Sequence, residues 1–296
     1  MDLYDFKSIL KTDFPMNTIS SMKTGGTVKY LFSPDSEEKF ISLMEYLREN
    51  KIKYKVLGNI SNVLIPDGYL DFCFVLTGKL SSYCLSKKNT IYASCGTPLT
   101  LISSFAGKNS LSGLEFAYGI PGSCGGGIFM NAGAYGGELS SHITKVRAFD
   151  KRKCELVSLD NSECDFSYRH SVFQENKNLI ILGAYFELTP GNEDEIQKAC
   201  EENMAKRKSS QPLEYPSCGS AFKRPKDNFA GKLIQDSGLS GFSVNDACVS
   251  EKHAGFIINK GNATSEDVIK LISHIKKKVY KDSGIMLENE IEILKL

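Results

Sequence analysis

Two neighbouring segments read Gly119-Ile120-Pro121-Gly122-Ser123-Cys124-Gly125-Gly126-Gly127 and Met130-Asn131-Ala132-Gly133-Ala134-Tyr135-Gly136. They belong to a run of eight glycines, from Gly119 to Gly137, that no charged side chain interrupts. Because glycine loses more backbone entropy on folding than any other residue, this density indicates that the backbone must approach something closely. Successive backbone N–H groups can form an anion-binding nest, so the pattern predicts a diphosphate site. The alternative is a set of tight turns in a compact β-rich domain.

The composition favours a globular chain of two or three domains or subdomains. It has 296 residues, of which 41% are hydrophobic and 24% are charged, enough to bury a core. Lysine and arginine number 36 against 35 acidic residues, for a net charge of +1, so nucleic-acid partners are not expected. The longest apolar runs, such as Leu179-Ile180-Ile181-Leu182, are too short to span a bilayer, and no membrane insertion is expected.

The nine cysteines indicate a reducing compartment. Their number is odd and no C-x-x-C pair occurs, which fits free thiols better than a disulfide framework. The N-terminus is acidic and has no signal-peptide pattern, so a cytoplasmic location is expected. We interpret Cys95, Cys124 and Cys218, each beside a glycine, as small buried hydrophobic residues rather than nucleophiles. The four histidines show no metal-ligand spacing, and no metal is expected.

Hydrophobic periodicity predicts a β-α-β unit followed by a β-rich region. Strands are expected at 27–32 and 54–57, with a helix between them that opens at Ser36. The second strand runs into the turn-rich loop Gly58-Asn59-Ile60-Ser61-Asn62, and further strands are expected at 63–65 and 72–76. Residues 81–188 read as short strands, including a meander at 147–159, with one short helix at 99–108 and a buried strand at 179–188.

The last third of the chain reads differently. Residues 191–210 are polar and helical, as expected for a connection into a last subdomain. There Thr264 is a good N-cap with Asp267 three positions on, and Gly284 suits the C-cap of the same helix. Residues 287–294 are expected to form a final strand.

The glycine loops do not follow the dinucleotide fingerprint of the Rossmann fold. That fingerprint requires G-x-G-x-x-G between the first strand and its helix. Here the glycines follow a later strand or lie between strands, so backbone nests rather than one helix N-terminus are expected to hold the phosphates.

An ordered set of motifs gives the chain its resemblance to a known family, the UDP-N-acetylenolpyruvoylglucosamine reductases, also called UDP-N-acetylmuramate dehydrogenases. The spacing from Arg169 to Ser220 leaves no room for a tyrosine-bearing loop, so the chain is similar to the type II branch that lacks it. The motifs cover nearly the whole chain and are Thr24-Gly25-Gly26, Leu57-Gly58-Asn59-Ile60-Ser61-Asn62, Gly113-Leu114-Glu115-Phe116, Gly119 to Gly126, Asn131-Ala132-Gly133-Ala134-Tyr135-Gly136, Tyr168-Arg169-His170-Ser171, Gln211-Pro212, Gly219-Ser220-Ala221-Phe222, Lys252-His253-Ala254-Gly255-Phe256 and Leu287-Glu288-Asn289-Glu290.

The resemblance implies an α+β fold. Two subdomains would form an FAD-binding unit of the vanillyl-alcohol-oxidase (PCMH) type, and a C-terminal α+β subdomain would bind the substrate. On this sequence the expected ranges are 1–78 and 79–190 for the FAD-binding subdomains, 191–289 for the connecting helix and substrate-binding subdomain, and 290–296 for a C-terminal strand that returns toward the first.

The resemblance also implies the chemistry. NADPH would reduce noncovalently bound FAD, which would then deliver hydride to C3 of the enolpyruvyl group of UDP-N-acetylglucosamine-enolpyruvate. The product, UDP-N-acetylmuramate, is a peptidoglycan precursor, which connects the activity to cell-wall biogenesis, cell shape and cell division. Hydride addition leaves carbanion character at C2 beside a carboxylate, so the protein must supply a proton and stabilise negative charge.

Three residues match the family's catalytic positions. Ser220 matches the proton donor to C2, Arg169 a residue that stabilises the enolate-like carboxylate, and Glu290 the acid that completes this set. Without the resemblance, each residue has an ordinary interpretation. Arg169 would be a surface or ion-pair arginine, Ser220 a turn or cap residue, and Glu290 a solvent-facing residue of an alternating strand.

The motifs also indicate binding residues. A β-branched residue disfavours positive φ, so Ile60, where many members carry glycine, is expected in an ordinary backbone region. His253 and Arg207 are candidates for the substrate or its diphosphate, although the cluster Lys206-Arg207-Lys208 reads equally well as a solvated helix end. The residues expected to bind FAD are Gly58, Asn59, Ser61, Asn62, Ile120, Pro121, Gly122, Gly125, Gly126, Asn131, Ala132 and Gly133.

Two other functions compete with the reductase. Another FAD-dependent oxidase or dehydrogenase of the same fold would share the glycine loops, but it would not require Arg169, Ser220 and Glu290 together. A flavin- or nucleotide-binding module without activity would be favoured by the loss of any of the three, and all three are present. The sequence indicates no oligomeric state.

Overall fold

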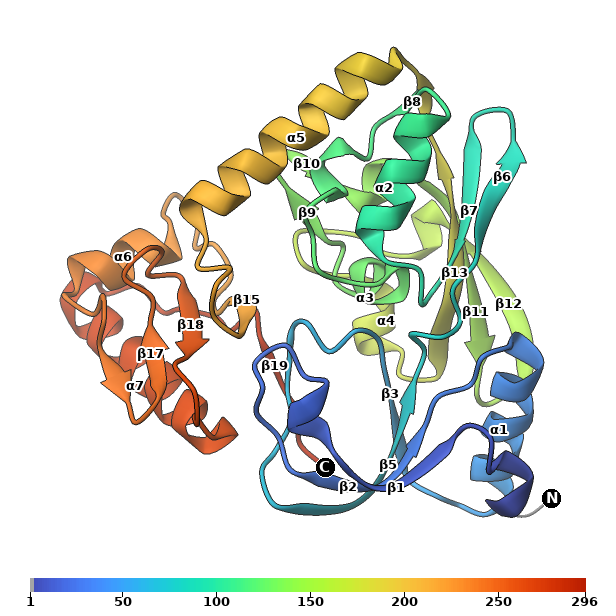
Figure 1. Cartoon of the computed structure of the whole chain (residues 1–296), viewed down its shortest axis with the longest axis horizontal. Coiled ribbons are helices and arrows are strands. Elements are labelled where there is room, and N and C mark those ends of the chain that lie inside the picture. Colours follow the sequence, from blue (N-terminus) through green and yellow to red (C-terminus); the bar gives the residue numbers. More distant parts are fainter. Residues whose placement is uncertain (1–2) are drawn as a thin grey trace. The chain divides into compact units, whose positions relative to one another are not determined.

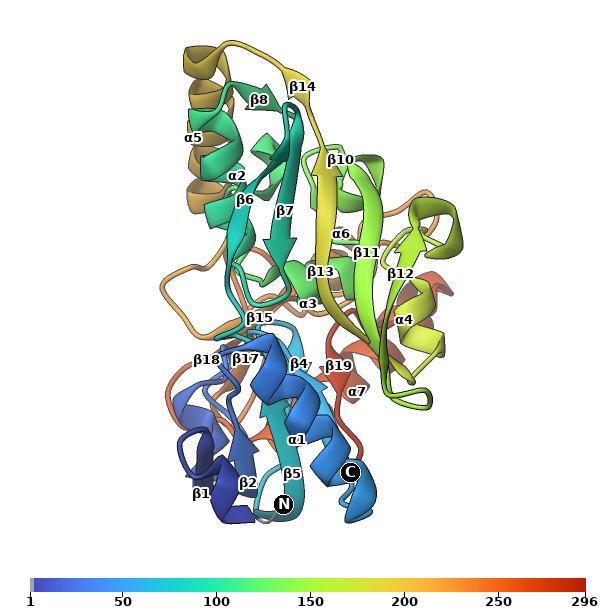
Figure 2. The same cartoon turned by 90° about the vertical axis from the view of Figure 1, so that its right-hand side faces the viewer.

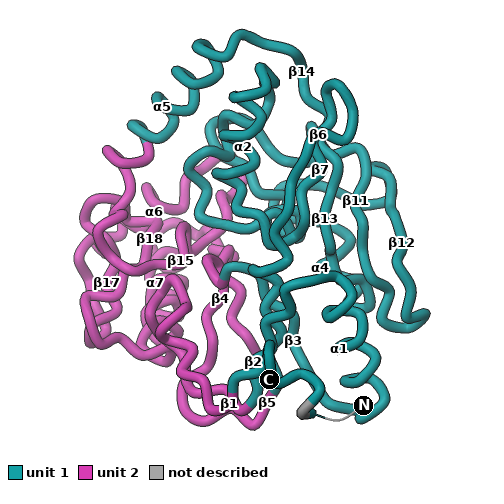
Figure 3. The backbone as a smooth tube through the Cα atoms, turned by 45° about the vertical axis from the view of Figure 1, so that its right-hand side comes forward, with its two compact units in different colours: residues 1–11, 30–59, 73–206 teal, residues 12–29, 60–72, 207–296 magenta. Residues whose placement is uncertain are grey.

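The computed structural model describes residues 3–296, and Figure 1 shows the order of its elements along the chain. The chain divides into two compact units, each built from discontinuous stretches (Figure 3). Unit 1 comprises residues 1–11, 30–59 and 73–206, and unit 2 comprises residues 12–29, 60–72 and 207–296. The expected subdomain borders after residues 78, 190 and 289 stay predictions.

The N-terminal region forms the expected β-α-β unit. A four-stranded sheet has the order β1-β2-β5-β3, and β3 pairs with β5 in parallel. Helix α1 begins where predicted, because the Ser36 hydroxyl accepts a hydrogen bond from the Lys39 N–H at 3.2 Å. The elements are β1 (Leu10–Pro15), β2 (Thr27–Phe32), α1 (Glu37–Glu49), β3 (Tyr54–Leu57) and β5 (Tyr69–Leu76).

A five-stranded antiparallel sheet is the framework of unit 1. Its order is β12-β11-β13-β7-β6, and the five strands lie side by side in Figure 2. Helix α2, the antiparallel pair β11–β12 and the buried strand β13 confirm the predicted helix, meander and buried strand. Phe40 of α1 and Ile102 of α2 belong to the same hydrophobic cluster as β13. The elements are β6 (Tyr83–Lys87), β7 (Thr90–Ser94), α2 (Leu99–Lys108), β11 (Ile143–Asp150), β12 (Glu155–Asp160) and β13 (Leu179–Glu187).

Short elements complete unit 1. One of them, α3, lies inside the glycine-rich run, where only loops were expected; Ser123 caps this helix. Two-stranded pairs join β9 to β10 and β8 to β14. The elements are β8 (Leu111–Ser112), α3 (Cys124–Phe129), β9 (Gly133–Ala134), β10 (Gly137–Glu138), α4 (Val172–Glu175) and β14 (Thr189–Pro190).

Unit 2 holds a second sheet with a long helix. The sheet order is β15-β18-β17-β16. The predicted caps of α7 are confirmed: Thr264 and Asp267 form a reciprocal capping box, and Gly284 takes a left-handed φ of 71°. The elements are β4 (Val63–Leu64), β15 (Ser217–Ser220), α6 (Ala230–Asp236), β16 (Ser243–Val244), β17 (Ala247–Val249), β18 (Phe256–Asn259), α7 (Ser265–Ser283) and β19 (Glu292–Ile293). The predicted polar helix is α5 (Glu193–Ser210), which begins in unit 1 and ends in unit 2.

The predicted strand over residues 287–294 is wrong as one continuous element. Asn289 makes an isolated bridge with Phe222, whereas β19 pairs in parallel with β4. The segment breaks between these because the N–H groups of both Glu290 and Ile291 point to the Ala221 carbonyl, at 2.9 and 3.5 Å. The C-terminal segment therefore pairs first with residues 221–222 and then with β4.

Two predictions about the whole chain can be compared with the structure. Within residues 3–296, no helix is both long and apolar enough to cross a bilayer. All nine cysteines lie in this range and are free thiols, as the odd number predicted.

Candidate active site

The second glycine loop, residues 119–127, is anchored by hydrogen bonds within the protein. The N–H groups of Cys124 and Gly125 donate to the carbonyls of Thr97 and Cys95, at 2.7 and 2.8 Å. The Gly126 N–H points to the Ser123 hydroxyl at 3.4 Å. The first N–H groups of α3 are therefore engaged within the chain. This observation agrees with the expectation that no single helix N-terminus holds the phosphates.

Two glycines of this loop differ in what surrounds them. A Cβ added at Gly125 would lie 2.9 Å from the Cys95 Cβ, so close packing requires glycine there. A Cβ at Gly126 would approach only the Ser123 hydroxyl, at 3.5 Å. Packing thus explains Gly125, while Gly126 leaves room for a ligand to approach the backbone.

The three cysteines that flank glycines are buried and inert. Cys95, Cys124 and Cys218 are at most 2% exposed. Burial raises the pKa of Cys95 and of Cys218 to about 12, and that of Cys124 well above its usual value. Since the thiolate is the nucleophile, the interpretation of these residues as small hydrophobic side chains is confirmed.

The first glycine loop comprises residues 58–62, and its first two residues lie against the second loop within unit 1. A Cβ at Gly58 would lie 2.7 Å from the Ser123 hydroxyl. The Asn59 side-chain amide points its N–H toward the Pro121 carbonyl at 3.5 Å. The structure therefore brings together residues from both segments that the sequence predicted to bind FAD.

Ile60 corrects one expectation. Its φ is 50°, in the left-handed region, not in an ordinary backbone region. Such a conformation costs an L-residue roughly 1–2 kcal/mol. The Ile60 side chain is only 4% exposed, and its carbonyl accepts a hydrogen bond from the Ser21 N–H at 3.2 Å. Burying an isoleucine contributes about 1.5–3 kcal/mol, which offsets the cost.

The first loop also offers backbone donors. Among residues 3–296, no acceptor takes the N–H groups of Asn59, Ile60 or Ser61. A left-handed residue within such a run is a feature of anion-binding nests. The residues present therefore fit the diphosphate of a dinucleotide cofactor.

Asn131 fixes the segment that follows α3. Its side-chain amide donates to the Ser167 carbonyl at 3.1 Å, and its side-chain oxygen accepts from the Ser140 N–H at 3.0 Å. The Asn131 side chain is fully buried, and its φ is 44°. It therefore braces the 131–133 segment against the turn that carries Arg169.

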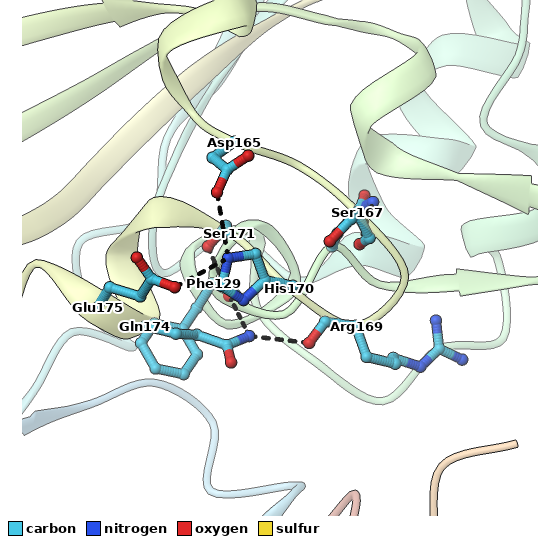
Figure 4. Close-up of polar contacts among 9 residues, drawn as sticks. Phe129, Asp165, Ser167, Arg169, His170, Ser171, Gln174 and Glu175 are labelled. Carbon is cyan, nitrogen blue, oxygen red and sulfur yellow. Dashed lines mark hydrogen bonds and ion pairs between the residues drawn. The ribbon is translucent and has the colours of Figure 1, made fainter. Parts of the chain in front are cut away.

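Arg169 lies at the tip of that turn. Its guanidinium Nη2 donates to the Gly133 carbonyl at 3.0 Å and lies over the Tyr168 ring, 5.0 Å from the centroid. Its φ of 56° is left-handed. The Gln174 side-chain amide donates to the carbonyls of both Arg169 and Phe129, each at 3.0 Å (Figure 4). Gln174 thus holds the strained turn in place.

His170 has two acidic neighbours that the sequence analysis missed. Its Nε2 lies 3.5 Å from Asp165 Oδ2 and 3.6 Å from Glu175 Oε1, and Figure 4 shows both carboxylates directed at the ring. These three groups could hold a metal ion. Contacts between a histidine ring and two exposed carboxylates account equally well for the cluster. The expectation of no metal stays a prediction.

Ser220 ends strand β15 in unit 2. It pairs with Phe256 across an irregularity in the ladder, next to Gly219, whose φ of 74° requires glycine. The Ala221 N–H donates to the Gly255 carbonyl at 2.8 Å, and the Ala221 carbonyl accepts from the Glu290 N–H at 2.9 Å. Two of the three predicted catalytic residues, Ser220 and Glu290, are therefore brought together around Ala221.

His253 lies beside the same strand. Its Nδ1 accepts a hydrogen bond from the Gly255 N–H at 3.1 Å, and its ring packs edge-on against Phe256. Burial lowers the pKa of His253 below its usual value of 6.5. With Nδ1 as acceptor, the neutral ring carries its proton on Nε2 and can donate it to a ligand.

Acid should destabilise the protein partly through His253. Below pH 6.5 the unfolded chain binds a proton at this position more readily than the folded chain, so this contribution to stability is complete above pH 6.5 and is lost as the pH falls. We expect urea unfolding at pH 7.5, 6.0 and 5.0 to show a smaller fall in the free energy of unfolding for His253→Gln than for the wild type. Parallel declines in the two proteins would contradict this assignment.

Arg207 lies in the last turn of α5. Its carbonyl accepts from the Gln211 N–H at 2.9 Å. One residue further, the Lys208 carbonyl accepts from the Lys252 ammonium group at 2.8 Å, which fixes the helix end to the segment that carries His253. Arg207 and Lys208 therefore belong to unit 2, whereas Lys206 and Arg169 belong to unit 1.

Sequence reasoning missed the residues that hold others in place. Gln174 follows the Tyr168-Arg169-His170-Ser171 motif by three positions, but nothing in a single glutamine indicates that it bonds two carbonyls. Such partners are set by tertiary contacts between segments distant in sequence, and residue type and spacing carry no signal for them.

The comparisons with known proteins first define the class. Residues 28–160 match the FAD binding domain family, and residues 211–294 match the C-terminal domain of UDP-N-acetylenolpyruvoylglucosamine reductase. A solved structure of UDP-N-acetylenolpyruvylglucosamine reductase from Thermus caldophilus is 30% identical with a TM-score of 0.81, covering 97% of this chain and 98% of that one. The chain is thus a flavoprotein, and the predicted α+β fold, with an FAD-binding unit and a C-terminal substrate-binding subdomain, is confirmed.

Curated relatives then define the family. The UDP-N-acetylenolpyruvoylglucosamine reductase of Caldicellulosiruptor saccharolyticus is 43% identical over 95% of this chain and 91% of its own length. That of Caldanaerobacter subterraneus is 45% identical over 95% and 92%, and that of Lactobacillus helveticus 42% identical over 99% of both chains. The chain belongs to the UDP-N-acetylenolpyruvoylglucosamine reductase family. It is an FAD-dependent oxidoreductase.

Proposed function

We propose that this protein reduces UDP-N-acetylglucosamine-enolpyruvate to UDP-N-acetylmuramate, a step in peptidoglycan precursor synthesis, with NADPH as electron donor. The observation that carries the proposal is the arrangement of Ser220 and Glu290 around Ala221, inside the region that matches the C-terminal domain of the reductases. The same proposal assigns the protein to the cytoplasm, where its nine free thiols are stable.

The two glycine loops are proposed to hold FAD without a covalent bond. The backbone donors of Asn59, Ile60 and Ser61 suit its diphosphate, and Gly126 gives the ligand access to the backbone. When bound, FAD supplies the transfer of a hydride equivalent from NADPH to C3 of the enolpyruvyl group. The proposed binding residues are Gly58, Asn59, Ser61, Asn62, Ile120, Pro121, Gly122, Gly125, Gly126, Asn131, Ala132 and Gly133.

Ser220 is proposed to donate the proton that C2 requires. As hydride adds to C3, the electron pair of the double bond moves toward C2, and the Ser220 O–H proton is transferred to that carbon. A serine hydroxyl is a weak acid, but the developing carbanion is a strong base, so transfer to it is favourable. The bonds on both sides of Ala221 fix the backbone beside Ser220, which supports a defined direction for this proton.

Arg169, together with Glu290 in its protonated form, is proposed to stabilise the charge that develops on the substrate carboxylate. A guanidinium is always charged and presents a planar fork that matches a carboxylate. The hydrogen bond to Gly133 and the bonds from Gln174 hold Arg169 before substrate arrives. Such preorganised charge costs no reorganisation during the reaction. Arg207 and the Nε2–H of neutral His253 are proposed to bind other parts of the substrate.

An anaerobic absorbance experiment tests the function. Purified protein with bound flavin is mixed with NADPH without oxygen, and UDP-N-acetylglucosamine-enolpyruvate is then added. Bleaching of the flavin by NADPH followed by recolouring with the substrate is the expected result. Bleaching without recolouring would indicate another flavoprotein oxidase or dehydrogenase of this fold. No flavin binding, even after FAD is added back, would indicate a protein that is not an enzyme.

A further inference from the structure

The side chain of Asn62 faces the C-terminal segment in unit 2. Its amide Nδ2 donates to the Glu290 carbonyl at 2.9 Å. Its own backbone carbonyl accepts from the Glu292 N–H at 3.0 Å. Directly after Asn62, strand β4 pairs with β19 in parallel, with Val63 opposite Glu292. The Asn62 side chain thus continues the pairing of the two strands past its end, toward Glu290.

Glu290 is consequently held through its backbone from two directions. Its N–H donates to the Ala221 carbonyl, and its carbonyl accepts from Asn62. A continuous chain of hydrogen bonds runs from His253 through Gly255 and Ala221 to Glu290 and on to Asn62. Ser220, next to Ala221, therefore shares its support with Glu290, and Asn62 contributes to that support.

The chemistry of the contact requires an amide. A carbonyl oxygen only accepts hydrogen bonds, so the group that faces Glu290 must be the NH₂ end of the Asn62 side chain. An alanine provides no donor and leaves the half-buried Glu290 carbonyl without this partner. Because Asn62 belongs to the loop proposed for the diphosphate, the sequence motif alone assigns its side chain to the cofactor, whereas the contacts assign it to Glu290.

We propose that Asn62 is a positioning residue for Glu290, so that its side chain serves the reduction of the substrate rather than the binding of FAD. This inference rests on the proposed function of the protein. The backbone of the first loop binds the diphosphate, and the side chain of its last residue sets the position of Glu290 relative to Ser220. Misplacing a reacting group by about 1 Å can lower a rate about 100-fold.

The test separates the two half-reactions in the FAD-loaded protein. Asn62→Ala is compared with wild type and with Asn50→Ala, a control outside the glycine loops whose side-chain amide also donates to a backbone carbonyl, that of Tyr46, at 2.9 Å. We expect Asn62→Ala to bind FAD and to be reduced by NADPH within about twofold of wild type. The limiting rate of anaerobic flavin reoxidation by UDP-N-acetylglucosamine-enolpyruvate should fall about 10- to 100-fold, with the half-saturating substrate concentration changed less than about threefold.

Each outcome decides the inference. Weaker FAD binding with unchanged reoxidation in Asn62→Ala would overturn it and return the side chain to the cofactor, as would wild-type rates in both half-reactions. If the wild type itself is not reoxidised by the substrate, the proposed function fails and the inference with it. If Asn62→Ala does not fold, Asn62→Ser, which keeps a polar residue but does not reach Glu290, is measured in its place with the same criteria.

Discussion

Alanine at position 220 should slow flavin reoxidation by the enolpyruvyl substrate about 1,000-fold, within the range of about 10²–10⁴ attributed to a positioned proton donor. FAD binding and flavin reduction by NADPH should stay at wild-type levels, because neither step needs a proton at C2. The fold should tolerate the change. The ladder contact with Phe256 and the hydrogen bonds of Ala221 are made by the backbone, so removal of the Ser220 hydroxyl breaks none of them.

A control on the same strand keeps this result interpretable. Ser217 lies at the other end of β15, is half-buried like Ser220, and pairs with Ile258. Ser217→Ala should therefore leave both half-reactions unchanged. A cysteine at position 220 should recover part of the rate, since a thiol can also donate a proton. Wild-type reoxidation in Ser220→Ala would mean that the proton comes from another group.

The elements that could be predicted from sequence are those fixed by local interactions. The caps at Ser36 and Thr264 satisfy backbone N–H groups three residues away, so the signal and the structure lie within the same turn. The left-handed residue at Gly284 is equally local. The periodicity of hydrophobic residues within one helix or strand also predicts which of its faces is buried. These features need no knowledge of the rest of the chain.

Ile60 and the C-terminal segment could not be predicted, because other segments determine their conformation. Ile60 takes a positive φ because burial of its side chain outweighs its intrinsic preference. Apolar and polar residues alternate over 287–294 as in a strand. In the structure, however, this segment first hydrogen-bonds to Ala221 and then pairs with β4. The pattern of residues within one segment does not specify which distant segment it will pair with.

The candidate site shows the same division. Sequence motifs predict catalytic roles for Ser220 and Glu290; those roles stay predictions, and the structure places both residues next to Ala221. The motifs gave no sign of Gln174 or of the carboxylates around His170, since these supporting contacts depend on how the 165–175 segment folds on Phe129. The residues proposed to touch the substrate were predicted from their type and motif, whereas the residues that hold them in place are defined by tertiary geometry.

Glycine at position 169 should separate function from stability. Removing the guanidinium should lower the rate of flavin reoxidation by the enolpyruvyl substrate about 10²–10³-fold, the usual cost of losing one preorganised group that stabilises developing charge. The free energy of unfolding should change by less than about 1 kcal/mol, because relief of the left-handed strain at Arg169 offsets the lost contacts with Gly133 and Tyr168.

Lys51 provides the matched control, because it is an exposed cation with a φ of 53° at the end of α1. Lys51→Gly relieves roughly 1–2 kcal/mol of left-handed strain and adds an entropic cost of roughly 0.5–1 kcal/mol, so it should raise the free energy of unfolding slightly and leave both half-reactions unchanged. Urea unfolding and anaerobic stopped-flow absorbance measure the two quantities on each variant. If Arg169→Gly kept wild-type reoxidation, the arginine would be a structural residue. If instead Arg169→Gly unfolded the protein, the Arg169 side chain would be required for folding. A large loss in the rate of flavin reoxidation, with a nearly constant free energy of unfolding, is the only result that assigns the left-handed backbone at Arg169 to function. In that case the turn is strained because it positions the guanidinium.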